Sequence, residues 1–260
     1  MRIMLRVSYD GREYCGWQFQ PGEKTIEGQL NMVLSNIYNT DIKVIGASRT
    51  DAGVHSLGNV CVFDVDQSKI PVEKLPYVMN NALPQDIRVW QSLQVDDDFH
   101  PRHTNSLKTY EYRIWNADFP DPVKRYYTHF TYRKLDVEKM REAAALLVGE
   151  HDFAAFVSAG SQAQTTVRTI YSIDIIEEYP DNTLNINNSN SVNSRLIVIR
   201  VKGSGFLYNM VRIIAGTLMS IGSGLKDVND ISLMLESGKR EYGGETAPAC
   251  GLTMIGIEFL

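Results

Sequence analysis

A carboxylate, a guanidinium, an imidazole and three glycines lie together in the stretch GASRTDAGVHSLGNV, residues 46–60, between two apolar runs. Asp51 is followed by Ala52 and Gly53, which give its carboxylate little steric cover, so a substrate could approach it closely. Aspartate in a loop is more often a turn former or a helix cap. The residue types therefore leave two interpretations of Asp51 open, a catalytic carboxylate and a turn residue.

The best partner for this carboxylate lies far away in the sequence. Arg212 is the only charged residue in FLYNMVRIIAGTLMSI, residues 206–221. A helix that is apolar nearly all round is usually buried, and a buried guanidinium needs a carboxylate partner. We therefore predict that Arg212 pairs with Asp51. The alternative is that Arg212 marks the solvent edge of its helix.

Other motifs with chemical potential are incomplete. VCVFDVDQS resembles the strand and DxDxT loop of phosphatases, with Asp64 and Asp66 as candidates, but the glycine and threonine that normally follow are missing. HPRH offers His100 and His103 without an evident third metal ligand. There is no P-loop and no GxSxG. The sequence thus predicts no metal, nucleotide or other cofactor.

Composition indicates an ordinary globular protein. The chain has 260 residues, of which 43% are hydrophobic and 22% are charged. No apolar run approaches the roughly 20 residues that a membrane helix needs, and MRIMLRVSYDG at the N-terminus lacks the apolar core of an export signal. The three cysteines, Cys15, Cys61 and Cys250, form no CxxC pair. We expect reduced thiols and a cytoplasmic protein.

The net charge of −5 conceals an uneven distribution of basic residues. Residues 195–226 contain five basic side chains and no acidic one, and residues 99–134 contain seven basic against three acidic. Whole-chain charge is a blunt measure, so a basic nucleic-acid-binding face is compatible with these numbers. A charge run can equally be a solvated face.

The apolar periodicity predicts the order βαββαβ in the first half of the chain. Ile3, Leu5, Val7 and Tyr9 alternate as in a half-buried strand, and Thr25 is a suitable N-cap for a following amphipathic helix. The remaining expected elements are strands at 42–47 and 59–65, a helix at 71–83 and a strand at 87–95. This order is typical of the ferredoxin-like arrangement, an antiparallel sheet with both helices on one face.

The second half repeats this order with an extra short helix. The expected elements are a strand at 109–115, a helix at 135–149, strands at 166–176 and 195–201, helices at 206–222 and 227–238, and a strand at 253–260. We therefore predict an α+β fold of two ferredoxin-like halves with mostly antiparallel sheets flanking a central cleft. The predicted domains are 1–98, which carries the aspartate loop, and 99–260, which completes the cleft. The Asn/Ser-rich stretch 180–194 is expected to be a mobile hairpin loop.

Several blocks of the chain together resemble a known family. YDGREYCGWQFQP with TIEGQL, then GASRTDAGVHSLGNV, then DDFHPRHTNSLKTYEYRI, then GSGFLYNMVRIIAGTL follow one another over nearly the whole chain. They look like the successive blocks of the tRNA pseudouridine synthases of the A type, and the RTDAGVH block is the most specific of them. The resemblance implies isomerisation of uridine to pseudouridine at positions 38, 39 and 40 of the tRNA anticodon arm, by a homodimer without a cofactor.

The same resemblance implies a role for each of four residues. Asp51 matches the catalytic aspartate, and Arg212 matches the basic residue that pairs with it. Tyr110 in LKTYEY matches the tyrosine that stacks on the target uracil, and its alternative role is that of an inward strand residue in the core. Arg49 resembles the arginine that helps to displace the target base; a phosphate contact or a surface ion pair is an equal alternative.

A non-catalytic interpretation is also open. Sheets of βαββαβ order commonly bind single-stranded RNA through surface aromatic residues. An RNA-binding module of this kind would leave the RTDAG loop unexplained, and no RNP1-like motif is visible. Conversion of uridine in unmodified tRNA, without added metal or nucleotide, distinguishes the two.

Overall fold

The fold is α+β, as the sequence predicts. The computed structural model describes residues 1–68, 70–179 and 194–260, and the chain divides into two compact units. Unit 1 comprises Met1–Lys108 together with Thr253–Leu260, and unit 2 comprises Thr109–Leu252. Most strand pairs in both units are antiparallel.

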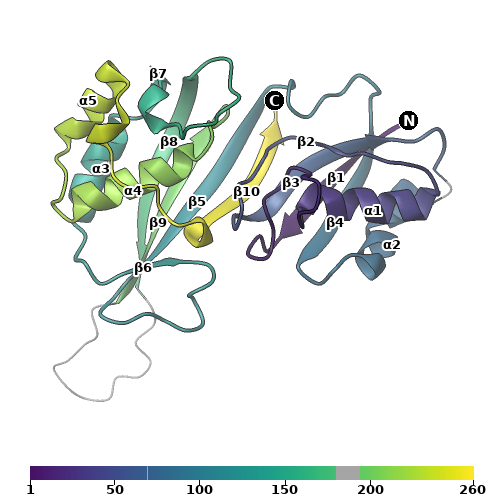
Figure 1. Cartoon of the computed structure of the whole chain (residues 1–260), viewed down its shortest axis with the longest axis horizontal. Coiled ribbons are helices and arrows are strands. Elements are labelled where there is room, and N and C mark those ends of the chain that lie inside the picture. Colours follow the sequence, from purple (N-terminus) through teal and green to yellow (C-terminus); the bar gives the residue numbers. More distant parts are fainter. Residues whose placement is uncertain (69, 180–193) are drawn as a thin grey trace. The chain divides into compact units, whose positions relative to one another are not determined.

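Unit 1 is a sheet with two helices packed on it (Figure 1). Its strand order is β4-β1-β3-β10, and the short β2 pairs with β3. β10 runs parallel to β3, with Thr253 opposite His55. The elements of unit 1 are β1 (Arg2–Tyr9), α1 (Ile26–Tyr38), β2 (Ile45–Gly46), β3 (His55–Asp64), a 3₁₀ turn (Val72–Lys74), α2 (Leu75–Ala82), β4 (Ile87–Val95) and β10 (Leu252–Phe259).

The core of unit 1 follows from the alternation of β1. Ile3, Leu5 and Val7 are fully buried against apolar residues of α1, α2 and β4. α1 begins where the sequence predicts, because the Thr25 hydroxyl accepts a hydrogen bond from the backbone N–H of Gly28 at 3.2 Å. The face of β1 that carries these side chains therefore fixes the side of the sheet on which both helices lie.

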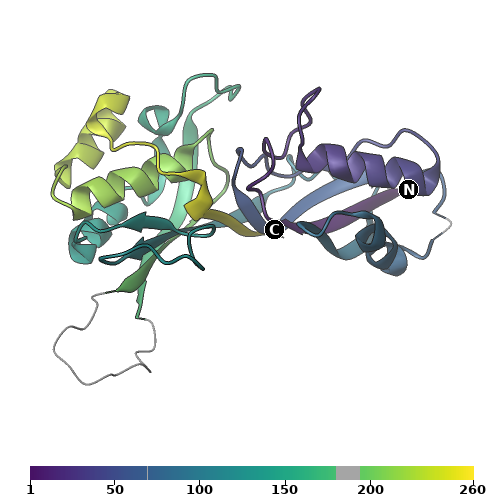
Figure 2. The same ribbon diagram turned by 60° about the horizontal axis from the view of Figure 1, so that its bottom comes forward.

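Unit 2 combines a second set of strands with three helices on one side (Figures 1 and 2). Its strand order is β5-β9-β8-β7, and β6 pairs in parallel with β5. α3 packs on α4 and on β8. The elements are β5 (Ser106–Asn116), β6 (His129–Thr131), α3 (Val137–Ala145), β7 (Gly149–Asp152), β8 (Val167–Glu178), β9 (Arg195–Gly203), α4 (Met210–Gly222), α5 (Asn229–Ser237) and three 3₁₀ turns (Ala154–Phe156, Arg240–Tyr242, Ala249–Gly251).

Several boundaries differ from the sequence prediction for local reasons. The helix expected from residue 206 begins at Met210, because Asn209 has a left-handed φ of 62° that no helix interior accommodates. The expected strand at 42–47 is reduced to Ile45–Gly46. β3 begins at His55, four residues before the start of the strand expected at 59–65. The alternation rules missed β6 and β7, which are only three and four residues long.

Some predictions are not decided by these observations. The two ferredoxin-like halves, the central cleft and the division into domains 1–98 and 99–260 stay predictions. The Asn/Ser-rich stretch lies outside the described residues except for Ser194. Within the described ranges, no helix is both long and apolar enough to cross a membrane.

Candidate active site

Asp51 opens a tight turn at the start of β3. The backbone N–H of Val54 donates to the carbonyl oxygen of Asp51 at 3.1 Å, which closes a four-residue turn. Gly53, the third residue of this turn, has a φ of +79°, a conformation that glycine adopts without steric cost. Asp51 is half-buried and Ala52 is exposed, so the turn lies at the surface of the protein.

A second loop, residues 10–17, holds both ends of this turn. The backbone N–H of Trp17 donates to the carbonyl of Thr50 at 3.0 Å, and the N–H of Gly53 donates to the carbonyl of Tyr14 at 3.3 Å. Hydrogen bonds on either side of Asp51 leave its backbone little freedom, which is a requirement for a group that must meet a reacting atom.

A series of hydrogen bonds among buried side chains holds the residues that precede this turn. The hydroxyls of Tyr9 and Thr50 lie 2.8 Å apart, and the Asn59 amide nitrogen donates to the Tyr9 hydroxyl at 3.2 Å and to the Ser48 carbonyl at 3.0 Å. Tyr9, Thr50 and Asn59 are all buried. Sequence reasoning missed this support because its members are separated by 41 and 50 positions.

Loop 10–17 is in turn anchored at its centre by Tyr14. The Tyr14 hydroxyl donates to a carboxylate oxygen of Asp86 at 2.6 Å, and the Lys24 ammonium lies 4.2 Å from the centre of the Tyr14 ring. Burial, and then the hydrogen bond to Asp86, raise the pKa of Tyr14. The Tyr14 hydroxyl therefore stays protonated and continues to donate its hydrogen bond to Asp86.

Gly16→Ala should disturb the Asp51 turn specifically. Gly16 has a φ of +87°, and a Cβ there would lie 2.7 Å from the Thr50 carbonyl oxygen, so the neighbouring backbone must move. A displacement of about 1 Å at a catalytic group can cost about 10²-fold in rate. Since the sequence predicts that Asp51 is catalytic, we expect kcat to fall by at least about tenfold.

Gly22→Ala is the matched control for this substitution. Gly22 has a similar φ of +82°, but an added Cβ meets nothing within 4 Å. Both variants should lose about 1–2 kcal/mol of stability from the left-handed conformation, and only Gly16→Ala should lose rate. Equal kcat values for the two variants would show that the contact with Thr50 does not position the turn.

The other candidate in this region, Arg49, lies two residues before Asp51 and is exposed. Asp51 and Arg49 thus belong to the same loop of unit 1, whereas Tyr110 and Arg212 belong to unit 2. The pairing of Asp51 with Arg212 stays a prediction.

Tyr110 is a buried residue of β5. Its ring meets that of Phe206 edge to face, with the centroids 5.2 Å apart and the planes at 82°. Tyr112, two residues further on the same face, is fully buried and donates its hydroxyl to the Pro248 carbonyl at 2.9 Å. The ring of Tyr110 is thus held in a fixed orientation, which suits either a core residue or a stacking platform.

Arg212 lies in the first turn of α4 and is half-buried. Its Nε donates to the Ala247 carbonyl at 2.7 Å, and its Nη1 donates to the Asn209 side-chain oxygen at 2.7 Å. The backbone N–H of Ala247 returns a bond to the Arg212 carbonyl at 3.1 Å. These contacts fix the guanidinium at the N-terminal end of α4.

The opposite face of β5 carries an ionised carboxylate. Glu111 is buried, and it accepts hydrogen bonds from Arg113 at 2.8 Å and from Arg200 at 2.7 Å. Burial alone would raise the pKa of the Glu111 carboxyl, but the two guanidinium groups outweigh it and hold the pKa below its usual value. Glu111 thereby ties β5 to β9.

This lowered pKa predicts how stability depends on pH. A carboxyl whose pKa is depressed in the folded state stabilises the fold above its unfolded pKa of about 4.3, and the contribution is lost as the pH falls through the folded value. Both arginines are about 40% exposed, so we expect solvent screening to limit the contribution to about 1–3 kcal/mol. Urea unfolding of Glu111→Gln and the parent at pH 7 and pH 3 measures it. A difference between the two proteins that is the same at both pH values would contradict the assignment.

The described residues include no group of three or more His, Cys, Asp or Glu side chains placed to hold a metal ion. The HPRH histidines lie with their rings 4.1 Å apart, and burial and the neighbouring charges of His103 and Arg102 lower the pKa of His100.

Comparison with known proteins gives consistent matches over the whole chain. Residues 6–103 and 143–259 match the family model described as tRNA pseudouridine synthase. The chain is 40% identical over 257 residues to tRNA pseudouridine synthase A of Acetivibrio thermocellus, covering 99% of each chain. It is 41% identical over 262 residues to the protein of the same name from Bacillus subtilis, covering 100% of this chain and 99% of the relative.

One solved structure gives a much weaker match. The archaeal box H/ACA sRNP Nop10-Cbf5 complex is 12% identical with a TM-score of 0.29, over 97% of this chain and 46% of that one, which is too low a likeness to inform the fold. The family model and the full-length relatives are decisive: the chain belongs to the tRNA pseudouridine synthase family.

Proposed function

We propose that this protein isomerises uridine to pseudouridine at positions 38, 39 and 40 in the anticodon stem-loop of tRNA. The observation that supports this most strongly is the 41% identity to a tRNA pseudouridine synthase A over the full length of both chains. The second support is the turn in which unit 1 holds Asp51, with hydrogen bonds on either side of it.

The reaction needs few chemical groups. The N1–C1′ bond breaks, the uracil rotates, a C5–C1′ bond forms, the C5 proton leaves and N1 gains a proton. Composition does not change, so the proposed reaction uses no redox or nucleotide cofactor. A carboxylate near the ribose can add to C1′, stabilise positive charge there, or remove a 2′ proton. We propose the first role, that of nucleophile, for Asp51.

The other predicted residues are assigned to binding and positioning. We propose that Arg212 pairs with Asp51 and favours its ionised form, because a nearby positive charge lowers the pKa of a carboxyl. A uridine in a paired stem must leave the helix, which costs a few kcal/mol and is partly offset by stacking on an aromatic ring. We propose Tyr110 as that ring and Arg49 as the residue that helps to displace the base.

An unmodified tRNA transcript tests the proposal directly. Purified protein should form pseudouridine in it with chelator present and with no added nucleotide. Primer-extension stops after carbodiimide treatment should then appear at positions 38 to 40. Binding of the transcript with no stops at any position would favour the non-catalytic RNA-binding module instead.

We further propose that the protein acts as a homodimer in which two copies share one tRNA. An anticodon arm is large relative to a 29.4 kDa chain, and closed two-fold symmetry is the commonest form of assembly. Light scattering at micromolar concentration should give twice the chain mass. A fully active monomer would exclude the dimer without affecting the proposed reaction.

A further inference from the structure

An unusual surface segment follows β5. Residues 117–134, here called the 117–134 platform, run from the end of β5 through β6 towards α3. Three of its apolar or aromatic side chains are strongly exposed: Phe119 at 73%, Val123 at 80% and Tyr132 at 72%. Large side chains exposed in this way mark interaction sites when they share one segment.

Basic residues alternate with these side chains. The platform contains four basic side chains, Lys124, Arg125, Arg133 and Lys134, and two acidic ones, Asp118 and Asp121, although the chain as a whole carries −5. Asp121 is engaged within the platform, where it accepts from the backbone N–H of Val123 at 2.8 Å and pairs with Lys124. The charge left to face a partner is therefore positive.

The N-terminal part of the platform is held in one conformation. The Trp115 indole donates to the Phe119 carbonyl at 3.1 Å, and the Lys124 ammonium lies 4.3 Å from the centre of the Trp115 ring. The backbone N–H of Ala117 donates to the Thr131 carbonyl at 3.2 Å. Because the backbone is already ordered, binding of a partner here costs little conformational entropy, which favours affinity.

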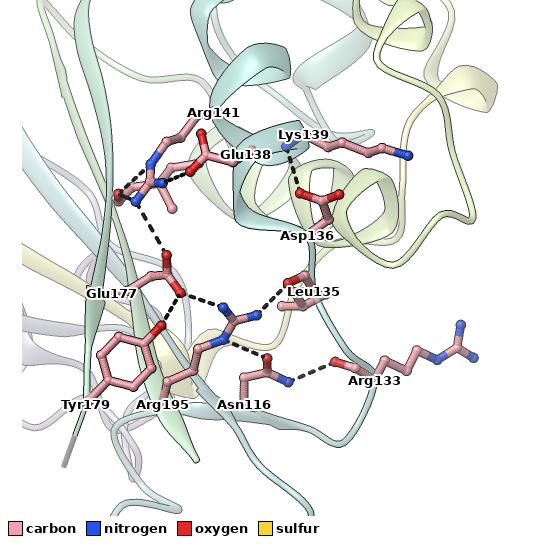
Figure 3. Close-up of polar contacts among 11 residues, drawn as sticks. Asn116, Arg133, Leu135, Asp136, Glu138, Lys139, Arg141, Glu177, Tyr179 and Arg195 are labelled. Atoms are coloured by element: carbon pink, nitrogen blue, oxygen red, sulfur yellow. Dashed lines mark hydrogen bonds and ion pairs between the residues drawn. The ribbon is translucent and has the colours of Figure 1, made fainter. Parts of the chain in front are cut away.

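The C-terminal part is anchored by the polar network in Figure 3. The Asn116 amide donates to the Arg133 carbonyl at 2.8 Å and accepts from Arg195 Nε at 3.2 Å. Arg195 also pairs with Glu177. The Arg133 guanidinium points away from this network, so its backbone is fixed while its charge remains directed outward (Figure 3). Within the network, the charge of Arg195 is paired with that of Glu177, and the Arg133 guanidinium takes no part.

Exposed rings among outward-facing cations match the chemistry of unpaired nucleotides. Bases without a partner stack on aromatic side chains, and their phosphates attract lysine and arginine. A duplex offers only its backbone to such a surface. The core of a protein interface is depleted in lysine, whereas this platform carries Lys124 and Lys134. We propose that the 117–134 platform binds unpaired nucleotides of the RNA substrate, which extends the proposed function to a second contact surface.

Three alanine variants test this, each at a strongly exposed position where folding is not at risk. Phe119→Ala and Tyr132→Ala remove one ring each from the platform, and Tyr77→Ala removes a ring that is 69% exposed on α2. The probes are an unmodified tRNA transcript, a twelve-nucleotide single-stranded RNA and a blunt RNA duplex of the same length, with binding followed by fluorescence anisotropy.

The expected loss of RNA affinity is confined to the platform variants, Phe119→Ala and Tyr132→Ala. Stacking on one ring corresponds to roughly a 5- to 150-fold change in affinity, so Kd for the single strand and for tRNA should rise by a factor in that range in Phe119→Ala or Tyr132→Ala. Tyr77→Ala should stay within about twofold, as should duplex binding by every variant. In turnover assays the platform variants should raise KM and leave kcat nearly unchanged.

Arg133→Gln tests the cation independently of the rings. Losing one phosphate contact should lower the salt slope of tRNA binding by about one. An unchanged slope would mean that Arg133 does not contact a phosphate and would remove the charge argument for RNA.

Several results would overturn the proposal. One is wild-type affinity for the single strand in both ring variants, or no binding of the single strand by the parent protein. Another is an equal loss on duplex and single strand, which would indicate backbone contacts only. A third is a halved mass of the Phe119→Ala/Tyr132→Ala variant in light scattering, which would make the platform an interface between copies of the chain. Each of these outcomes is read from RNA binding or from the mass of a variant, whereas the proposed function is tested by pseudouridine formation in the parent protein, so failure here and failure of the proposed function are distinguishable.

Discussion

Asp51→Asn should bind tRNA with nearly the parent affinity and form no detectable pseudouridine. The turn around this residue depends on backbone groups, since the Asp51 carbonyl accepts from Val54 and the flanking residues bond to loop 10–17. Asparagine is similar in size and also suits turns, so folding should survive. An amide is a poor nucleophile and carries no charge for a cationic ribose, so the rate should fall by at least about 10³-fold.

Tritium release from tRNA labelled at uridine C5 measures this loss, alongside binding of the same tRNA. Asp66→Asn is the matched control, because Asp66 is an exposed carboxylate of unit 1 and belongs to the incomplete phosphatase motif. It should release tritium at the parent rate. Parent-like release by Asp51→Asn would make Asp51 a turn residue and move the catalytic assignment elsewhere.

Tyr110→Phe should bind tRNA normally and release the C5 proton slowly. Phenylalanine keeps the ring and its edge-to-face contact with Phe206, so the stacking surface persists. Only the hydroxyl is lost. We propose that this hydroxyl lies where the C5 proton leaves and accepts it, and removal of a group that assists proton transfer typically costs about 10²–10⁴-fold. Deuterium at C5 should therefore slow the variant more than it slows the parent protein, because proton removal becomes limiting.

Tyr112→Phe provides the comparison for this variant. It removes a hydroxyl from the same strand and the same face, and that hydroxyl is already bonded to the Pro248 carbonyl. The variant should lose about 0.5–1.5 kcal/mol of stability and no rate. If Tyr110→Phe behaved like Tyr112→Phe, Tyr110 would be a core residue and the proton acceptor would have to be sought elsewhere.

The spacing of apolar residues and the helix caps in the sequence were enough to predict most helices and strands. In these elements the buried residues are the ones that the apolar spacing indicates. β4 has the predicted bounds, and α1 begins after the predicted Thr25 cap. α4 begins later than its apolar pattern suggests, because the left-handed conformation of Asn209 is set by its contacts, including a bond to Ser158 at 2.9 Å. Periodicity carries no information on such a contact.

The candidate site was predictable only in part for the same reason. The Asp51 loop stands out by composition, but the groups that hold it, such as Tyr9, Asn59 and Tyr14, look like ordinary strand and loop residues in the sequence. Tyr14 contacts Asp86 across 72 positions, a separation that local patterns do not encode. The exposed rings of the 117–134 platform are also invisible to alternation rules, which assign aromatic residues to the core.

The parallel pairing of β10 with β3 has a consequence for how the protein is made. Unit 1 contains Thr253–Leu260, so the body that holds Asp51 recruits a strand synthesised only after the whole of unit 2. Domains ordinarily fold in the order in which they leave the ribosome. Here the His55–Ser56 end of β3 must wait for its β10 partner while unit 2 is being translated, and unpaired strand edges attract strands from other chains. The first unit to emerge is thus the last to be completed, and its vulnerable period is as long as the translation of unit 2.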